Sequence, residues 1–256
     1  MSSFSRRPNF RDEAFVLRSY KLGEADQILV ILTKNRGIVR GVAKGIRKTK
    51  SRFGARLDRF SKVNVQIYSG RNLGKITDAA SVTSYAPAIV EDVDRFVAGV
   101  AMLEVAQILA TAESSSRSVF SFLDANLALL TTSTTMDFPV PQALPPITVA
   151  DRFVIQGLAD AGWMPSLVDC AQCGKPGPHW AFHPRAGGAV CVMCRPPGSS
   201  TPPPEAVRLL WLLANDRMGV AVQVAKDPTV VRAAHELLLG HLRQQLDVNC
   251  PAFASL

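Results

Sequence analysis

Apolar and polar residues alternate with a period of two through much of the first 80 residues. Short segments rich in β-branched residues follow one another there, with turn signals at residues 35–37 and 69–72. In residues 62–68 every second position is Val or Ile, which predicts one buried and one solvent-facing side. The pattern predicts a small antiparallel β-barrel with five strands, at about residues 14–20, 27–33, 37–44, 62–68 and 73–79.

From residue 88 onward, apolar residues recur with the helical period of about 3.6. We interpret these stripes as core faces of helices at about residues 89–106, 119–130, 150–160 and 228–246. A Thr- and Pro-rich segment at 131–146 predicts a linker or a long loop. Thr201 is a candidate N-cap for a further helix that begins in the prolines behind it.

Positive charge is concentrated in the part of the chain that is expected to form the barrel. Residues 1–80 contain eighteen Lys or Arg and six Asp or Glu, a net charge of +12, whereas the remaining residues have a net charge of -4. Between Lys34 and Lys62, eleven basic residues accompany one acid, Asp58, and apolar residues recur among them. A disordered tail would lack this apolar pattern, so we expect a folded basic surface of the kind that binds nucleic-acid phosphates.

Residues 45–56 are too many for a hairpin turn and are expected to project from the barrel. Seven cations lie on the third strand and on this projection, and we predict that they contact phosphates: Arg40, Lys44, Arg47, Lys48, Lys50, Arg52 and Arg56. A solvated charged surface without a ligand would give the same pattern, so that alternative stays open. Phe53, among these cations, could stack on a base or belong to the barrel core.

Two Cys-x-x-Cys pairs lie in the second half of the chain. Cys170 and Cys173 form the first pair, Cys191 and Cys194 form the second, and seventeen residues separate the pairs. This spacing is typical of a four-cysteine zinc site. Four thiolates saturate a tetrahedral ion and leave no position for water, so we predict one structural Zn²⁺.

Other interpretations of the cysteines stay open. The pairs could be redox motifs, disulfides or incidental buried thiols, and His179 or His183 could replace one cysteine as a ligand. Five cysteines are an odd number for a secreted disulfide framework, and the first eight residues contain no apolar stretch, which favours a reducing cytosol. Cys250 is expected to be a bystander thiol.

The sequence does not support several kinds of enzyme site, and we expect no catalytic residue. There is no P-loop, and the cysteine region lacks the His-x-Glu and Pro-Cys-x-x-Cys motifs of zinc deaminases. His235-Glu236 begins like a zinc-protease motif, but the next histidine, His241, lies six positions on and off the shared helix face. A nuclease built from scattered carboxylates stays open as an alternative.

No membrane partner is expected. The most apolar run, residues 97–110, is interrupted by Glu104 and Gln107 and is shorter than the ~20 residues that cross a bilayer. Binding of the basic region to lipid headgroups is an open alternative.

Two stretches of the chain resemble the recombination mediator RecO of bacterial DNA repair. In residues 11–80 the matching motifs are Ala14-Phe15-Val16-Leu17-Arg18, Gly23-Glu24-Ala25-Asp26-Gln27-Ile28, Ala43-Lys44-Gly45-Ile46-Arg47, Ser51-Arg52-Phe53-Gly54 and Tyr68-Ser69-Gly70-Arg71-Asn72-Leu73. In residues 158–195 they are Ala161-Gly162-Trp163-Met164-Pro165, Cys170-Ala171-Gln172-Cys173-Gly174 and Phe182-His183-Pro184-Arg185-Ala186-Gly187-Gly188.

The resemblance implies an α+β architecture. Its parts are a basic leader at 1–10, a five-stranded OB-fold β-barrel at 11–82, and an α-helical domain at 83–256 that carries a four-cysteine zinc-binding insert at about 165–198. The C-terminal residues 247–250 lack the basic ending expected of the family.

The resemblance also implies a non-enzymatic role in DNA repair and homologous recombination. Such a protein binds single- and double-stranded DNA, anneals complementary strands coated with single-stranded-DNA-binding protein, and with RecR assists RecA loading. It is expected in the bacterial cytoplasm, associated with the nucleoid during repair. An RNA-binding or ribosome-associated zinc protein is the main alternative.

Overall fold

The computed structural model describes residues 9–70, 73–111, 116–132 and 143–256. The chain divides into two compact units, of which the first comprises Met1–Val93 with Ala106–Ala128 and the second Asp94–Val105 with Leu129–Leu256. The division therefore crosses two helices, α2 (Val93–Thr111) and α3 (Ser116–Thr132).

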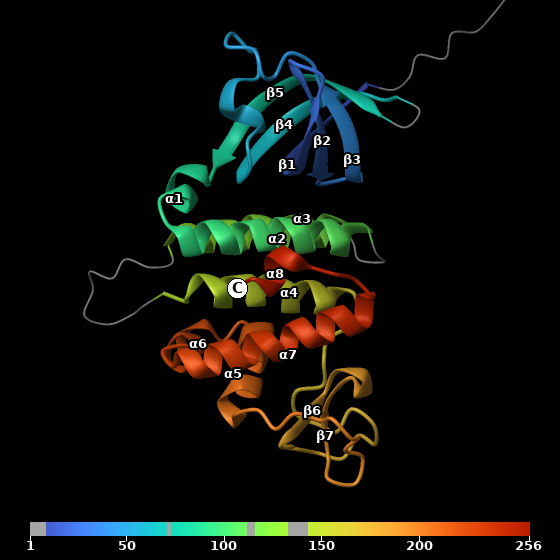
Figure 1. Ribbon diagram of the computed structural model, residues 1–256, viewed down its shortest axis with the longest axis vertical. Helices are drawn as coiled ribbons and strands as arrows, with labels where there is room; N and C mark the ends of the chain where they lie inside the picture. Colours follow the sequence, from blue (N-terminus) through green and yellow to red (C-terminus); the bar gives the residue numbers. More distant parts are fainter. Residues whose placement is uncertain (1–8, 71–72, 112–115, 133–142) are drawn as a thin grey trace, which may run out of the picture. The chain divides into compact units, whose positions relative to one another are not determined.

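The first unit contains a closed five-stranded barrel (Figure 1). Its strands are β1 (Asn9–Leu22), β2 (Asp26–Thr33), β3 (Gly37–Ala43), β4 (Ser61–Tyr68) and β5 (Gly74–Ser84). They follow the order β1-β2-β3-β5-β4, and β4 pairs back onto β1. Only β3 and β5 run parallel among the barrel pairs of the described residues. The predicted five-stranded OB-fold barrel is confirmed.

β1 is twice as long as the segment that the alternation predicts. It begins at Asn9, so the end of the predicted leader is part of the barrel. Its first half, from Asn9 to Phe15, pairs with β4, and residues from Ala14 to Leu22 pair with β2. A strand that closes a barrel needs two partners, and staggered partners lengthen it.

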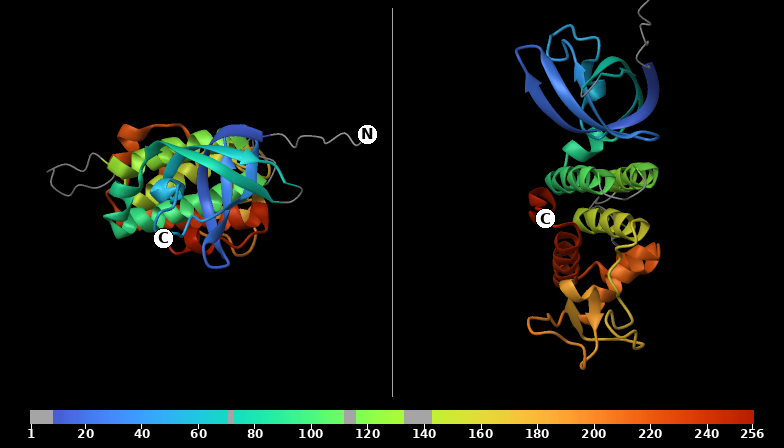
Figure 2. Two further views of the ribbon diagram at one scale, coloured as in Figure 1. Left: turned by 90° about the horizontal axis from the view of Figure 1, so that it is seen from above. Right: turned by 90° about the vertical axis from the view of Figure 1, so that its right-hand side faces the viewer.

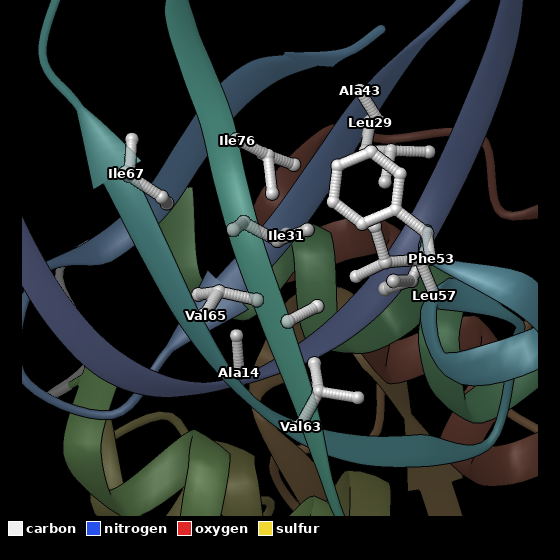
Figure 3. Packing of buried hydrophobic residues seen from close by; sticks show 12 residues of the cluster. Ala14, Leu29, Ile31, Ala43, Phe53, Leu57, Val63, Val65, Ile67 and Ile76 are labelled. Carbon is white, nitrogen blue, oxygen red and sulfur yellow. The ribbon is translucent and has the colours of Figure 1, made fainter. Parts of the chain in front are cut away.

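The barrel interior is filled by side chains from all five strands and from the β3–β4 connection (Figure 3). β4 alternates between buried and more exposed residues, as predicted. The residues of the barrel core are Ala14, Val16, Leu29, Ile31, Ala43, Phe53, Leu57, Val63, Val65, Ile67, Ile76 and Ala79.

In the parts of β1 and β2 that lie near α3, the outward-facing residues are buried as well as the inward-facing ones. Their outward residues Phe15 and Leu32 are fully buried. The ring of Phe15 lies 5.0 Å from that of Phe120 in α3, measured between centroids. At the same end of the barrel, Lys62 Nζ donates a hydrogen bond to Asp124 Oδ2 at 2.7 Å. Part of α3 therefore covers this end of the barrel.

The second unit is mainly helical. Besides parts of α2 and α3 it contains α4 (Pro146–Asp160), α5 (Pro204–Ala214), α6 (Met218–Val224), α7 (Pro228–Leu246) and α8 (Pro251–Ala254), whereas the short α1 (Ala86–Val90) belongs to the first unit. α4, α5 and α7 pack against one another. Within the described residues, no helix has the length and apolar character needed to cross a membrane.

The prediction that Thr201 caps α5 is wrong. Pro203 occupies the N-cap position and α5 begins at Pro204. The hydroxyl of Thr201 instead accepts a hydrogen bond from Arg195 Nη2 at 3.1 Å. Proline is compatible with the first helical turn because the first backbone N–H groups have no partner within the helix.

Buried polar groups connect the helices of the second unit. His235 Nδ1 on α7 lies 2.7 Å from Asp151 Oδ1 on α4, and both side chains are buried. Glu104 Oε2 accepts hydrogen bonds from the backbone N–H groups of Ala252 and Phe253, at 2.9 and 3.1 Å. The two bonds of Glu104 hold the C-terminal helix α8 in place. His235 makes a structural contact with Asp151 and is not part of the metal-ligand group found among the described residues.

The cysteine pairs lie in an insert between α4 and α5. It contains β6 (Ala181–His183), β7 (Gly188–Val190) and a short 3₁₀ helix, η2 (Pro184–Ala186). η2 contacts α7, and Figure 2 shows the insert in gold beside the red helix. At Gly188, which has a φ of +132°, an added Cβ would clash with the Ser166 carbonyl oxygen. A side chain there would therefore separate the insert's strand from residue 166.

Candidate nucleic-acid interface and metal centre

The β3–β4 connection, residues 44–60, carries most of the predicted cations and is fixed to the barrel at its start. The Gly45 N–H donates to Asp26 Oδ1 at 2.7 Å, and the Arg47 N–H donates to the Ala25 carbonyl at 3.0 Å. Gly45 has a φ of +70°, a conformation that favours glycine. The connection is thus attached to the turn between β1 and β2 where it leaves β3.

Phe53 and Leu57 anchor the far part of the same connection. Phe53 immediately precedes the 3₁₀ helix η1 (Gly54–Leu57), Leu57 is its last residue, and both enter the barrel core (Figure 3). The side chain of Phe53 is only 1% exposed. Of its two predicted roles, the core position is therefore the one observed, and the ring is not available to stack on a base.

All seven predicted phosphate-binding cations are exposed. Three have contacts that orient them: Arg47 donates to the Glu24 carbonyl at 3.0 Å, Arg56 donates to the Arg52 carbonyl at 2.9 Å, and the Arg52 guanidinium lies 4.8 Å from the Phe53 ring centroid. The other four make no side-chain hydrogen bond or ion pair with any described residue: Arg40, Lys44, Lys48 and Lys50. No described residue neutralises their charges through such a contact.

Strand register places the start of the β3–β4 connection at the barrel end opposite to the one that α3 covers, with Arg40 midway along β3. Ala43, at the end of β3, pairs with Gln27 of β2 and Ile76 of β5. The residues that meet α3, Phe15 and Lys62, pair with each other on β1 and β4 at the opposite end. The basic connection and the uncovered strand ends therefore form one surface of the first unit.

Two exposed tyrosines on this surface were missed by the sequence reasoning. The side chains of Tyr20 and Tyr68 are 45% and 44% exposed. Tyr68 follows the alternation of β4 and was predicted to face solvent, without a function. Tyr20 was not recognised because β1 has a register shift between Val16 and Arg18, which moves later residues to the other face. Counting by two from the interior residue Val16 would place Tyr20 inside.

The four paired cysteines lie together. Their sulfur atoms are all within 4.8 Å of one another, and Cys173 Sγ lies 3.8 Å from Cys191 Sγ. A tetrahedral zinc ion with Zn–S bonds of ~2.3 Å separates its sulfurs by about 3.8 Å. All five cysteines, which lie in the described ranges, are free thiols. The cluster can hold a metal ion.

Hydrogen bonds shift the pKa values of two thiols of this cluster in opposite directions. The Cys191 N–H donates to Cys170 Sγ at 3.4 Å, which lowers the pKa of Cys170 to about 6. Hydrogen bonding with Cys173 and Cys191 raises the pKa of Cys194 to about 12. A cation among the four sulfurs would favour the thiolate form of all of them.

Neither histidine of the insert belongs to the cluster. His179 Nε2 lies 2.8 Å from the Lys175 carbonyl oxygen, and His183 Nδ1 accepts a hydrogen bond from the Ala186 N–H at 3.3 Å. Both rings have other partners in the insert. Cys250 is buried outside the cluster, at the N-cap of α8.

Family models match nearly the whole chain. The model described as "Recombination protein O N terminal" matches residues 7–85, and "Recombination protein O C terminal" matches residues 90–251. The chain belongs to the recombination protein O family. Membership assigns it a general role in DNA repair and recombination, and the resemblance found in the sequence is confirmed.

Proposed function

We propose that this protein is a recombination mediator that binds single- and double-stranded DNA and anneals complementary strands. With RecR, it would help RecA to replace single-stranded-DNA-binding protein on DNA. Family membership supports this role, and the observation that carries the DNA-binding part is the set of seven exposed cations on β3 and the β3–β4 connection. Arg40, Lys44, Arg47, Lys48, Lys50, Arg52 and Arg56 are the proposed phosphate contacts.

The arrangement of these cations supports binding to the backbone of DNA. A connection anchored by Phe53 and Leu57 presents its charges on a stable support, which reduces the entropy lost on binding. Four of the cations have no intramolecular partner among the described residues, so a phosphate need not displace one. Contacts of this kind position DNA and carry little sequence information.

Backbone contacts also explain how annealing proceeds without ATP. When cations neutralise the phosphates of two strands, the repulsion between the strands falls. The hydrogen-bonding edges of the bases stay free to pair. We therefore expect annealing with slight sequence preference.

We further propose that Cys170, Cys173, Cys191 and Cys194 hold one structural Zn²⁺. The 3.8 Å separation of Cys173 Sγ and Cys191 Sγ fits a tetrahedral zinc–thiolate site. Four sulfur ligands leave no open position, so the ion would stabilise the insert and take no part in a reaction.

The experiment that tests DNA binding is a salt titration with a matched pair of variants. Lys44, Lys48 and Lys50 are changed to Glu in one variant, and Arg217, Lys226 and Arg232, exposed on the second unit, are changed to Glu in the control. For wild type, log affinity for a single strand should fall with log salt by about 0.7 per phosphate contacted. The first variant should lose most affinity and annealing, whereas the control should keep both.

Three results would contradict the proposal. Equal annealing by wild type and the Lys44, Lys48 and Lys50 variant would refute the site. A preference for RNA over a DNA strand of the same sequence would favour the RNA-binding alternative. Cleavage of DNA on addition of magnesium would favour a nuclease. Annealing of coated strands with and without added RecR tests the mediator role.

A further inference from the structure

A row of outward-facing residues crosses the barrel at the uncovered end. Each member pairs with the next on the neighbouring strand, and the row, here named the tyrosine row, consists of Tyr20, Ile28, Val42, Lys75 and Tyr68. It crosses β1, β2, β3, β5 and β4 in turn. With four steps of ~4.8 Å between strands, the path of the row over the curved barrel surface is about 19 Å long.

Burial shows that the row faces outward. Its members alternate along their strands with core residues such as Leu29, Ala43 and Ile76. Tyr20, Tyr68 and Lys75 are exposed, whereas Ile28 and Val42 between them are half-buried. Two half-buried apolar residues and one exposed lysine therefore lie between two exposed aromatic rings.

Positive charge borders the tyrosine row. Lys75 lies in the row itself. Arg40 lies two residues before Val42 on β3, so its side chain is on the same face of the strand as Val42. Lys44 lies two residues after Val42, just beyond the end of β3. Arg40 and Lys44 have no hydrogen bond or ion pair with a described residue. An occupant with aromatic faces and regularly spaced negative charges complements this surface, and single-stranded nucleic acid has both.

We propose that Tyr20 and Tyr68 stack on unpaired bases of a single strand whose phosphates the neighbouring cations hold. This inference rests on the proposed DNA binding and adds a second, uncharged contribution to it. Aromatic side chains accept any base because every base has a π-face. The row is long enough for several nucleotides, within the roughly 4–16 that OB folds cover.

Stacking gives the barrel a preference between the substrate and the product of annealing. A base stacked on a tyrosine keeps its hydrogen-bonding edge free and can pair with an incoming strand. In a duplex the base faces are covered by neighbouring base pairs, so the tyrosines lose their contacts. The row therefore binds single strands more tightly than duplexes, and pairing weakens the hold on the product.

The test compares the full-length protein with a variant carrying Tyr20→Leu and Tyr68→Leu. Leucine keeps an apolar side chain at each position but cannot stack. Affinity for an oligo-thymidine strand should fall roughly fivefold or more for each tyrosine, while affinity for a duplex changes little. The salt dependence should be unchanged, because no phosphate contact is lost.

Two controls accompany this variant. Tyr20→Phe with Tyr68→Phe keeps the rings and should bind as wild type does. Val82→Ala changes another exposed apolar residue of β5 outside the row and should also bind normally. With wild type, a strand containing 2-aminopurine should change its fluorescence on binding in the way that stacking produces, and this signal needs no variant.

The outcomes separate this inference from the proposed function. If the leucine variant binds single strands as wild type does, or if 2-aminopurine reports no stacking, the tyrosine row has no such role, although DNA binding through cations stands. Equal losses for single strands and duplexes also overturn it. If wild type binds neither form at low salt, the proposed function itself fails.

Discussion

The β3–β4 connection and the cysteine insert are both irregular segments, but they are held in place in different ways. The connection places two large side chains, Phe53 and Leu57, in the core of a closed barrel. The insert has two strands of three residues, and its one large buried ring, Phe182, lies outside its own buried cluster. That cluster consists of small side chains and cysteines: Cys170, Ala181, Ala186, Val190 and Cys191. So small a core stabilises little, and such units need a metal or disulfides.

This difference explains why the β3–β4 connection can carry many cations and why the insert carries four cysteines. A segment anchored by a hydrophobic core can carry many like charges, because burial of Phe53 offsets their repulsion. A segment without such a core depends on bonds to an ion. Four predictions test this difference, from the largest expected effect to the smallest.

Replacement of one thiol should unfold the insert alone. In Cys191→Ser, bound zinc should fall from one per chain to nearly none, because structural zinc contributes about 10–16 kcal/mol in small zinc units. Hydrogen exchange should lose protection in β6 and β7 but not in the barrel, and DNA affinity should change less than about twofold, since the sites are independent. Cys250→Ala, the matched control, should retain the metal. An insert that stays protected without metal would contradict the comparison.

Removal of the hydrophobic anchor should affect the barrel and spare the insert. Phe53→Ala should lower the free energy of unfolding by about 3–5 kcal/mol, because a large buried ring leaves a cavity. Urea denaturation measures the loss, and zinc content should not change. Val82→Ala, which shortens an exposed side chain on β5, should stay within about 0.5 kcal/mol of wild type. Similar effects of the two changes would show that Phe53 is no anchor.

The stability of the packing between α4 and α7 should depend on pH through the pair of Asp151 and His235. Burial opposes protonation of His235, but the hydrogen bond and charge of Asp151 outweigh it and raise the pKa of His235. Burial also raises the pKa of Asp151, against the opposing effect of His235. Because folding raises the pKa of His235, its protonation stabilises the folded state. This stabilisation is fully present below the pKa of histidine in the unfolded chain, ~6.5, and is lost as the pH rises through the pKa in the folded protein.

His235→Gln tests this pH dependence. Breaking a buried pair should cost about 3 kcal/mol at pH 6, and the difference from wild type should narrow as pH rises above ~7. Thermal melting across this range gives the comparison. A difference that grows with pH would show that the pair has the opposite linkage.

The smallest effect on stability is expected at Arg56, whose side chain links the β3–β4 connection to β5. Its guanidinium donates to the carbonyl oxygens of Arg52 and Ala79, at 2.9 and 3.4 Å. Arg56→Met should cost about 1 kcal/mol, because these hydrogen bonds are exposed or only partly buried. It should also reduce the salt slope of DNA binding by about 0.7. Arg232→Met on the second unit should change neither quantity.

Local patterns in the sequence were sufficient for much of the fold and for the metal ligands. Short segments rich in β-branched residues, with turn signals among them, predicted all five strands, and the alternation of residues 62–68 predicted the buried side of β4. The two Cys-x-x-Cys turns predicted the cluster, because each turn brings its own two thiols together. The helices α6 and α8 were missed because four to seven residues are too few to show a helical period.

Only the tertiary structure decided features that depend on residues far apart in the chain. Phe15 and Phe120 meet across more than a hundred residues, and their contact buries a barrel face that alternation alone assigns to solvent. A register shift in β1 turns Tyr20 outward, and pairing through three further strands aligns it with Tyr68. The sequence by itself therefore determined which residues are charged, apolar or metal-binding. Strand register and helix packing, which sum many weak contacts between distant segments, determined which of them share a surface.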